Sequence, residues 1–494
     1  MQGSLKNVSE KQYGKFIPVL LFVISFLASL MTSNNIWKST ISGPDSSVFL
    51  YIGKMITKGY IPYRDTFDHK GPLLYLINAI GYSISPRIGV WIIELFFLFG
   101  TVFFIFRCAS LFLDNIKSLI VTLVCVAQLA YFLEGGNLAE EYAMLFLAYS
   151  MFVFVDYFKS GNITRLRLVL TGVSFAAVCL IRANMISVWI VFCLAVLVQC
   201  FRYQNFKELG RYLLFFILGA VILALPFMVW LSANNALDDF VNAYLRFNAA
   251  YTKDPELGGV KNIIISLIDF YEYPIVTIVF ASAVFVTFKE HRKLDVLYLI
   301  YLIVTMALMC MSGRNYPHYA MVLIPALVYP FTRLVEILED TDSKTCNAAI
   351  FMTSIALVLP CIARYGNIVV LNRTYSDRDQ TIFNICNVID RNSEEGDKII
   401  VNGNEDCIYL LSDRDSLSKY SYQSPVAKIS PDIAKEYYKD LRTKKAKLVV
   451  FSNSDWNYKE VKNIIEDLNY RQIVEESIGV DPGKYSIYVY GLDE

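Results

Sequence analysis

Long apolar segments recur along most of the chain, and each is close to the length that a helix needs to cross a bilayer. A transmembrane helix requires about 20 mainly apolar residues. Eleven runs meet or nearly meet this length: residues 16–31, 88–112, 119–133, 143–157, 166–181, 186–201, 212–231, 263–288, 296–311, 319–337 and 348–362. The sequence therefore predicts an all-α polytopic membrane protein with about eleven spans.

The composition supports this interpretation and excludes several other classes. Hydrophobic residues make up 55% of the 494 residues and charged residues only 18%, where soluble proteins carry about 25%. The 45 basic and 45 acidic side chains cancel, which argues against a nucleic-acid-binding protein and against a disordered chain. The ten cysteines show no CxxC or Cys/His metal spacing, and they lie mostly in apolar runs.

The charged residues are concentrated at the end of the chain. Residues 366–494 hold 39 of them in 129 positions, whereas residues 1–365 hold 51. This difference predicts a transmembrane domain over 1–365 and a water-exposed domain over 366–494. The latter alternates a helical pattern at 382–389 with strand patterns at 398–401, 447–451 and 485–490, as in a small α/β domain.

Short loops rich in Lys and Arg mark the inner side of a membrane protein. If the N-terminal lysines lie inside, most loops on the outer side contain little positive charge. An odd number of spans then places residues 366–494 outside. The loop over residues 34–71 contradicts the rule, because it carries five basic residues yet must lie outside. We therefore expect function there.

This first outer loop has an unusual pattern of polar and apolar residues. After a Gly-Pro turn at Asp45, apolar residues at helical spacing predict a surface helix that Gly59 ends. Pro62 then predicts an extended segment through Tyr63, Arg64 and Asp65, and Asp-His-Lys-Gly-Pro leads into a second helix at 73–84 that is interfacial or re-entrant. Polar side chains are thus held at headgroup depth.

Each polar residue of this loop also has a simpler explanation. Asp45 could be a helix cap worth about 1 kcal/mol, Lys70 could reach toward lipid phosphates, and Arg64 with Asp65 could be a surface ion pair of little energy. The dense combination favours a substrate path, because ionisable residues near a bilayer are costly and usually functional.

The loop also resembles a known family. An Asp after the first span, followed by GYIPYRDTFDHKGPL, resembles the GT-C class of polytopic glycosyltransferases. The resemblance is closest to the bacterial relatives of protein O-mannosyltransferases and of the lipid A aminoarabinose transferase. It implies transfer of a hexosyl or pentosyl group from a polyprenyl-phosphate carrier to a lipid, glycan or protein acceptor. The implied location is the outer face of a bacterial cytoplasmic membrane, with no nucleic-acid partner.

The family's functional residues transfer to this chain one at a time. Asp45 occupies the place of the acidic residue that acts as base toward the acceptor hydroxyl or orients it. Lys70 matches the basic residue that faces the lipid phosphate, with Arg64 and His69 as further candidates for binding the carrier phosphate or donor. His69 stands where the aminoarabinose transferase has Glu, which removes a possible metal ligand. Metal dependence is therefore not carried over: no cofactor is certain, and a divalent metal stays an alternative without support.

One base with a cationic phosphate clamp predicts direct displacement and inversion. The opposite outcome needs a second carboxylate, about 5 Å away in hydrolases. The segment EGGNLAEEY offers Glu141 as this candidate. Acidic residues are equally expected at a helix N-terminus, where the macrodipole favours them.

The segment SGRNYPHY supplies two further candidates, Arg314 and His318, for contact with the phosphate or the donor sugar. Its tyrosines could instead form an aromatic belt at the membrane surface, but this pattern also recurs in the bacterial relatives. Arg182 and Arg246 are weaker phosphate candidates.

Two other classes of function remain alternatives to a glycosyltransferase. A polysaccharide polymerase or ligase typically relies on arginine-rich outer loops, and the long loop 233–262 holds one arginine. A flippase or transporter usually shows paired half-repeats, and no repeat is visible in this sequence.

Overall fold

The computed structural model describes residues 16–37, 41–251, 260–339, 343–424, 426–477 and 485–492. The N-terminal lysines used to predict orientation lie outside these ranges. The chain forms two compact units that are both discontinuous in sequence. The first comprises residues 1–35, 91–229 and 255–369, and the second comprises residues 36–90, 230–254 and 370–494.

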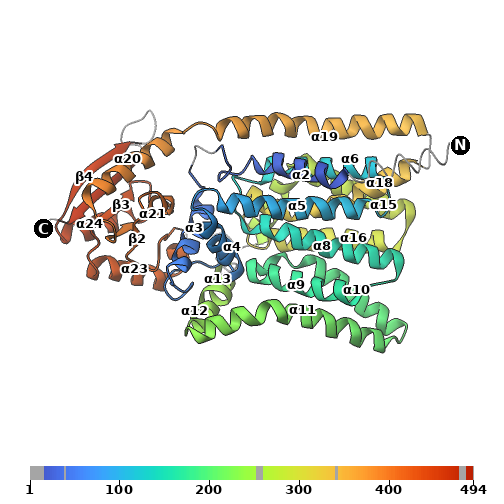
Figure 1. Cartoon of the computed structure of the whole chain (residues 1–494), viewed down its shortest axis with the longest axis horizontal. Coiled ribbons are helices and arrows are strands. Elements are labelled where there is room, and N and C mark those ends of the chain that lie inside the picture. Colours follow the sequence, from blue (N-terminus) through green and yellow to red (C-terminus); the bar gives the residue numbers. More distant parts are fainter. Residues whose placement is uncertain are drawn as a thin grey trace. The chain divides into compact units, whose positions relative to one another are not determined.

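The first unit is a helical bundle whose long helices run side by side (Figure 1). All eleven predicted apolar runs fall on helices, so their helical character is confirmed. The helices are α2 (Ile17–Ser29), α5 (Gly89–Ala109), α6 (Asn115–Ala127), α7 (Leu129–Phe132), α8 (Ala139–Ser160), α9 (Arg165–Ile181), η1 (Ala183–Met185), α10 (Ser187–Arg202), α11 (Phe206–Ala233), α14 (Val260–Tyr271), α15 (Pro274–Glu290), α16 (Lys293–Cys310), η3 (Pro317–Val322), α17 (Leu323–Ala326), α18 (Val328–Glu339) and α19 (Ser343–Leu371).

The predicted number of spans is not confirmed. Among the described residues, six helices are long and apolar enough to cross a membrane, and eight spans result if each of two bent pairs counts as one. One pair, α14 with α15, bends by 91°, and residues 317–326 with 328–338 bend by 44°. The protein is thus multi-pass, with several apolar helices too short to cross alone.

Glycines allow two helices of the bundle to approach closely. A Cβ at Gly172 of α9 would lie 1.9 Å from the carbonyl oxygen of Phe216, and one at Gly219 of α11 would lie 1.9 Å from that of Val169. Lipid-embedded helices associate mainly by packing, and small residues at the crossing allow this packing. A larger side chain at either position would separate α9 from α11.

The second unit contains a five-stranded sheet with the order β2-β1-β3-β5-β4. Strands β1 (Lys398–Val401), β2 (Asp415–Ser416) and β3 (Leu448–Ser452) are parallel, while β4 (Tyr470–Ser477) and β5 (Ser486–Leu492) add an antiparallel edge. The accompanying helices are α20 (Asp377–Asn392), α21 (Cys407–Leu411), α22 (Val426–Ile429), α23 (Pro431–Thr443) and α24 (Tyr458–Asp467). The predicted α/β character of this region is confirmed.

The loop helices α3 (Pro44–Thr57) and α4 (Pro72–Ile84) pack on each other within this second unit. It also includes α12 (Leu237–Phe240), the π-helical turn η2 (Val241–Arg246) and α13 (Phe247–Tyr251). Ile41, Tyr51 and Met55 belong to one apolar core with side chains of α20, β1, β3 and β5. The loop and the end of the chain therefore share a core.

A buried ammonium group adds a polar connection between the same parts. Lys54 of α3 is 0% exposed, and its Nζ lies 2.6 Å from a carboxylate oxygen of Asp413 and 3.6 Å from one of Asp415. Because the Lys54 ammonium is buried, loss of its carboxylate partners would leave a buried charge without compensation. This contact therefore fixes α3 to the loop before β2.

One local expectation was wrong. The segment after Pro62 is a turn and not an extended strand, because the Asp65 N–H donates to the Ile61 carbonyl at 3.0 Å and an isolated bridge joins Pro62 to Thr66. Tyr63 takes φ 72°, a conformation that is uncommon for a bulky residue. Its hydroxyl donates to the Lys70 carbonyl at 2.8 Å, and this contact holds the turn against the start of α4.

Candidate active site

Three consecutive residues before α4 form a chain of polar contacts. The Lys70 Nζ lies 3.0 Å from His69 Nε2, and His69 Nδ1 lies 3.1 Å from Asp68 Oδ1. Asp68 is 2% exposed, whereas the side chains of His69 and Lys70 are only partly buried. The buried carboxylate thus orients an imidazole, and the imidazole contacts an ammonium group that reaches the surface.

Tyrosines from distant positions complete the surroundings of Asp68. The Tyr75 hydroxyl of α4 donates to Asp68 Oδ2 at 2.7 Å, and the Tyr422 hydroxyl donates to Oδ1 at 2.6 Å. The Lys70 N–H donates to the Tyr75 oxygen at 3.0 Å. These bonds fix the backbone of the 68–70 segment together with its side chains.

The charge state of Asp68 follows from these neighbours. Burial opposes ionisation of the carboxyl, but the charge of Lys70, with hydrogen bonds from His69 and Tyr422, outweighs burial and lowers its pKa. A nearby cation favours the charged form of an acid in this way. Asp68 is therefore a permanent anion at neutral pH.

Aromatic rings hold the His69 side chain in place. Its ring lies 5.4 Å from the rings of both Tyr251 and Phe247, stacked on the former and tilted against the latter. The amide group of Asn248 also donates to the His69 carbonyl at 2.7 Å. The η2–α13 segment thus forms one wall of the site.

Asp45 lies in the first turn of α3, where its side chain is exposed. Two observations place it close to the Asp68 chain. The Lys70 Nζ lies 5.7 Å from the ring centroid of Phe49, which is one helical turn after Asp45. The charge of Asp45 also contributes, after burial and Asp68, to a raised pKa of Tyr422. The first turn of α3, which carries Asp45, therefore lies in the neighbourhood of Lys70 and Tyr422.

Arg64 faces different partners. Its guanidinium makes two bonds to Asp65, at 2.8 and 2.7 Å, and a third to the Asn234 carbonyl at 2.8 Å. It lines a separate polar pocket. Because these contacts engage the guanidinium, Arg64 is a weaker candidate for the carrier phosphate than the sequence suggested.

The first unit brings together two other predicted segments. His318 Nδ1 lies 2.6 Å from a carboxylate oxygen of Glu134, which also accepts the His318 N–H at 3.1 Å. Arg182 forms an ion pair with Glu140, and its guanidinium carbon lies 4.2 Å from the Tyr319 ring centroid. Residues 134–142 and 314–319 thus form one polar cluster.

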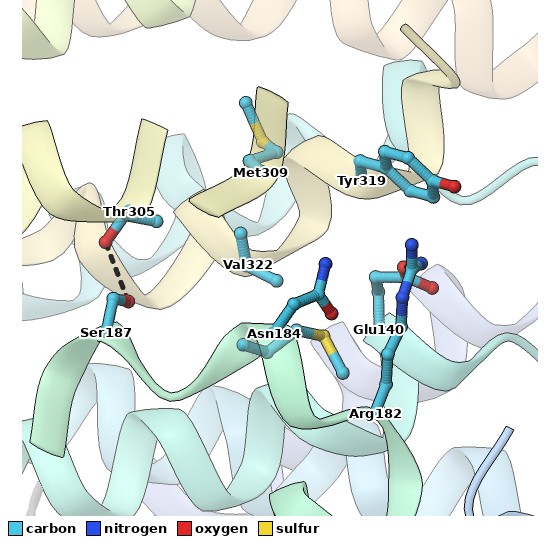
Figure 2. Close-up of a pocket in the computed structure, with 9 residues that line it drawn as sticks. Glu140, Arg182, Asn184, Ser187, Thr305, Met309, Tyr319 and Val322 are labelled. Carbon is cyan, nitrogen blue, oxygen red and sulfur yellow. Dashed lines mark hydrogen bonds and ion pairs between the residues drawn. The ribbon is translucent and has the colours of Figure 1, made fainter. Parts of the chain in front are cut away.

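A small pocket opens beside this ion pair. Figure 2 shows Arg182, Glu140 and Tyr319 at one end and the hydrogen bond between Thr305 and Ser187 at the other. The pocket volume is about 10 Å³, which holds a single water. Arg182 therefore has an anionic and an aromatic partner, and this particular pocket is too small for a phosphate.

Glu141 is 0% exposed and its Oε2 accepts the Asn137 N–H at 2.8 Å. Glu94 of α5 accepts the same N–H at 2.5 Å through Oε1. A Cβ at Gly136, whose φ is 76°, would lie 2.5 Å from that Glu94 oxygen, so glycine is required here. The catalytic assignment of Glu141 stays a prediction, as does the donor contact of Arg314, which is 7% exposed and in the same unit.

A second buried aspartate in the second unit was not predicted. Asp406 follows β1, is 0% exposed, and accepts a hydrogen bond from the Ser421 hydroxyl at 2.5 Å. Burial raises the pKa of Asp406 to about 7.

The sequence analysis also assigned no role to Asp68. This residue lies between Phe67 and His69 in the segment GYIPYRDTFDHKGPL, and its position next to two candidate residues could have drawn attention to it. Among the described residues, no three His, Cys, Asp or Glu side chains converge as metal ligands.

The fold is that of the GT-C membrane proteins. ArnT from Cupriavidus metallidurans bound to undecaprenyl phosphate superposes with a TM-score of 0.59 at 12% identity, covering 95% of this chain and 97% of that chain. Its apo state gives 0.56 at 11% identity with the same coverage. The oligosaccharyltransferase AglB from Archaeoglobus fulgidus, in complex with an inhibitory peptide and a dolichol-phosphate, gives 0.50 at 12% identity, covering 98% of this chain and 75% of that chain.

The sequence itself identifies the family. Residues 6–348 match the competence-induced Ccs4 N-terminal domain, and the chain belongs to this family. No curated protein has a significantly similar sequence.

Proposed function

We propose that the chain is a membrane glycosyltransferase that takes a sugar from a polyprenyl-phosphate carrier. The observation that carries this proposal is the Asp68–His69–Lys70 chain, which aims an ammonium group at the surface beside α3. The GT-C fold and the undecaprenyl phosphate bound to ArnT support it. We further propose that transfer occurs on the outer face of a bacterial cytoplasmic membrane, with residues 366–494 outside.

Lys70 stabilises the leaving phosphate in this proposal. An ammonium group has three N–H donors, and His69 contacts one of them, which leaves the others for phosphate oxygens. Negative charge develops on the phosphate as the bond to the anomeric carbon breaks. A preorganised cation stabilises this charge because it needs no rearrangement during the reaction.

Asp45 is the proposed base. The acceptor hydroxyl attacks the anomeric carbon, a new carbon–oxygen bond forms, the bond to the phosphate oxygen breaks, and the hydroxyl proton passes to the Asp45 carboxylate. A general base contributes typically about 10²–10⁴-fold to a rate. One displacement at the anomeric carbon gives inversion. The site needs no second carboxylate for this route.

The experiment is single-turnover sugar transfer by the full chain in proteoliposomes that contain undecaprenyl-phosphate-linked sugars. Lys70→Met and Asp45→Asn should each lower transfer by about 100-fold or more. The matched controls are Lys58→Met in the same loop and Asp238→Asn in the first turn of α12, both of exposed residues. Controls should stay within about threefold.

Two further measurements belong to this test: the stereochemistry of the product linkage and the membrane insertion of each variant. NMR of the product linkage should show inversion relative to the donor. If a well-inserted Asp45→Asn variant transfers sugar at the normal rate, Asp45 is not the base. If wild-type protein transfers no sugar from any polyprenyl-phosphate donor, the proposed activity is wrong.

A further inference from the structure

The carboxyl groups of Glu94 in α5 and Glu141 in α8 meet inside the first unit. The Asn137 nitrogen lies 2.5 Å from Glu94 Oε1 and 2.8 Å from Glu141 Oε2, and the two carboxyl groups are also hydrogen-bonded to each other. Such a bond needs a proton on one of them, because an ionised carboxylate only accepts. We infer that Glu94 and Glu141 share one proton, and that this pair fixes the turn over residues 134–137.

Two negative charges at this pair would have no compensation. Glu94 and Glu141 are each 0% exposed, and in the part of the chain that the structure describes neither of them forms an ion pair. Their outer oxygens, Glu94 Oε2 and Glu141 Oε1, are closed to solvent. Like charges in contact and away from water are too costly to persist, and such pairs keep one proton between them. The proton removes one charge and supplies the bond between the two groups.

The preceding residue, Glu140, has the opposite kind of partner. It also lies in the first turn of α8 and is 3% exposed, but it forms an ion pair with Arg182 (Figure 2). A nearby cation favours the ionised form of an acid. Two consecutive buried glutamates therefore differ: Glu140 is a carboxylate, whereas Glu141 belongs to a pair that holds a proton.

The turn that the pair contacts has an unusual backbone. Residues 134–137 take φ angles of 41°, 90°, 76° and 53° in sequence, and only the middle two are glycines. Non-glycine residues in this region are strained and persist where the surrounding structure determines them. The pair supplies this constraint through the Asn137 N–H.

The same turn carries a residue of the polar cluster described above. Glu134 begins the turn, and its carboxylate lies 2.6 Å from His318 Nδ1. A pair that holds one end of the turn therefore also determines where the carboxylate at the other end lies. Glu94 and Glu141 are thus positioning residues for the contact between Glu134 and His318.

The test is infrared difference spectroscopy of the full chain in lipid nanodiscs at pH 8, in H2O and D2O, with and without EDTA. Wild type should show the carbonyl stretch of a protonated carboxyl, which shifts in D2O. Glu94→Gln and Glu141→Gln should each remove the whole band, because the introduced amide replaces the shared proton as donor to the remaining carboxylate. Glu140→Gln is the matched control and should change only carboxylate bands.

Hydrogen exchange measures the hold of the pair on the turn. Glu94→Gln should leave the exchange of residues 134–138 as in wild type, because Gln has the shape of a protonated Glu. Glu94→Ala should make these amides exchange at least about tenfold faster. Phe96→Ala, at a 62% exposed position of the same helix, should have no effect on the turn.

Several results would overturn the inference. A wild-type spectrum without the band would show two carboxylates, a band halved in each Gln variant would show two protons, and a band seen only with EDTA would show a divalent cation in place of the proton. Failure of both Gln variants to fold would also contradict it, as would normal exchange in Glu94→Ala. No sugar donor is present in these measurements, so their outcome is independent of the transfer assay.

Discussion

Two of the buried aspartates in the second unit, Asp68 and Asp406, have similar surroundings and opposite behaviour. Asp68 and Asp406 are 2% and 0% exposed, and they accept hydrogen bonds from the consecutive hydroxyls of Tyr422 and Ser421, at 2.6 and 2.5 Å. Yet the pKa of Asp68 is lowered, while burial raises the pKa of Asp406 to about 7.

The difference comes from a neighbouring cation. Burial penalises both carboxylates, but the charge of Lys70, with hydrogen bonds, outweighs the penalty at Asp68, whereas the charged groups that act on Asp406 are the carboxylates of Asp68 and Glu405. Burial alone therefore does not identify a functional acid. The acid that belongs to the proposed site is the one that remains charged and orients a cation.

The largest expected effect separates the roles of these two residues in transfer. Asp68→Asn should lower transfer about 100-fold, because the imidazole and ammonium groups lose the anion that orients them. Asp406→Asn should stay within about threefold. Transfer rates of the two variants in proteoliposomes measure this difference. Asp68 acts through its neighbours, so kcat should fall far more than KM rises, and equal rates for both variants would contradict the comparison.

A smaller expected effect concerns how the stability of the folded chain depends on pH. The pKa of Asp406 is about 7 in the folded chain and about 3.9 in an unfolded one. The folded state therefore binds more protons between these values, and this residue's contribution to stability is lost as pH rises toward 7. The titration of Asp68 lies below this range.

Asp406→Asn removes that dependence. The unfolding midpoint of wild type should fall relative to the variant between pH 5 and pH 8, by an amount corresponding to about 3 kcal/mol. Thermal unfolding in nanodiscs at both pH values measures it, with Asp432→Asn at an exposed position as the control. Parallel pH curves for wild type and Asp406→Asn would show that Asp406 does not retain its proton.

The smallest expected effect compares the two hydroxyl donors. Tyr422→Phe removes the bond to a charged carboxylate and should lower transfer by about tenfold, since such bonds contribute about 1.5–3 kcal/mol. Ser421→Ala removes a bond to Asp406 and should leave transfer within about twofold. Single-turnover rates at one pH suffice for the measurement. A larger loss in Ser421→Ala would reverse the assignment of the two acids.

Local patterns predicted the elements but not the contacts between distant elements. The apolar runs became helices and residues 398–401 became a strand, because hydrophobic period and length determine these elements locally. The turn at Tyr63 depends on its hydroxyl bond to Lys70, and no local pattern shows this bond. The domain boundary at residue 366 stays a prediction.

In the candidate site, too, the sequence predicted local features but not contacts between residues that are distant in the chain. Asp45, His69 and Lys70 lie within 26 positions and were recognised together, whereas Tyr422 reaches Asp68 across 354 positions. A single sequence contains no signal for such a pairing. The role of Asp68 became visible only when the fold placed cations and tyrosines around it.

The core that α3 shares with the sheet also determines when the protein can be completed during synthesis. Ile41, Tyr51 and Met55 are synthesised before most of the bundle helices, whereas their partners in α20, β1, β3 and β5 are synthesised after them. Until then Lys54 has no Asp413 to neutralise it. The apolar side chains of α3 therefore lack these packing partners while most of the bundle is synthesised, and a chain that stops before residue 370 cannot complete this core.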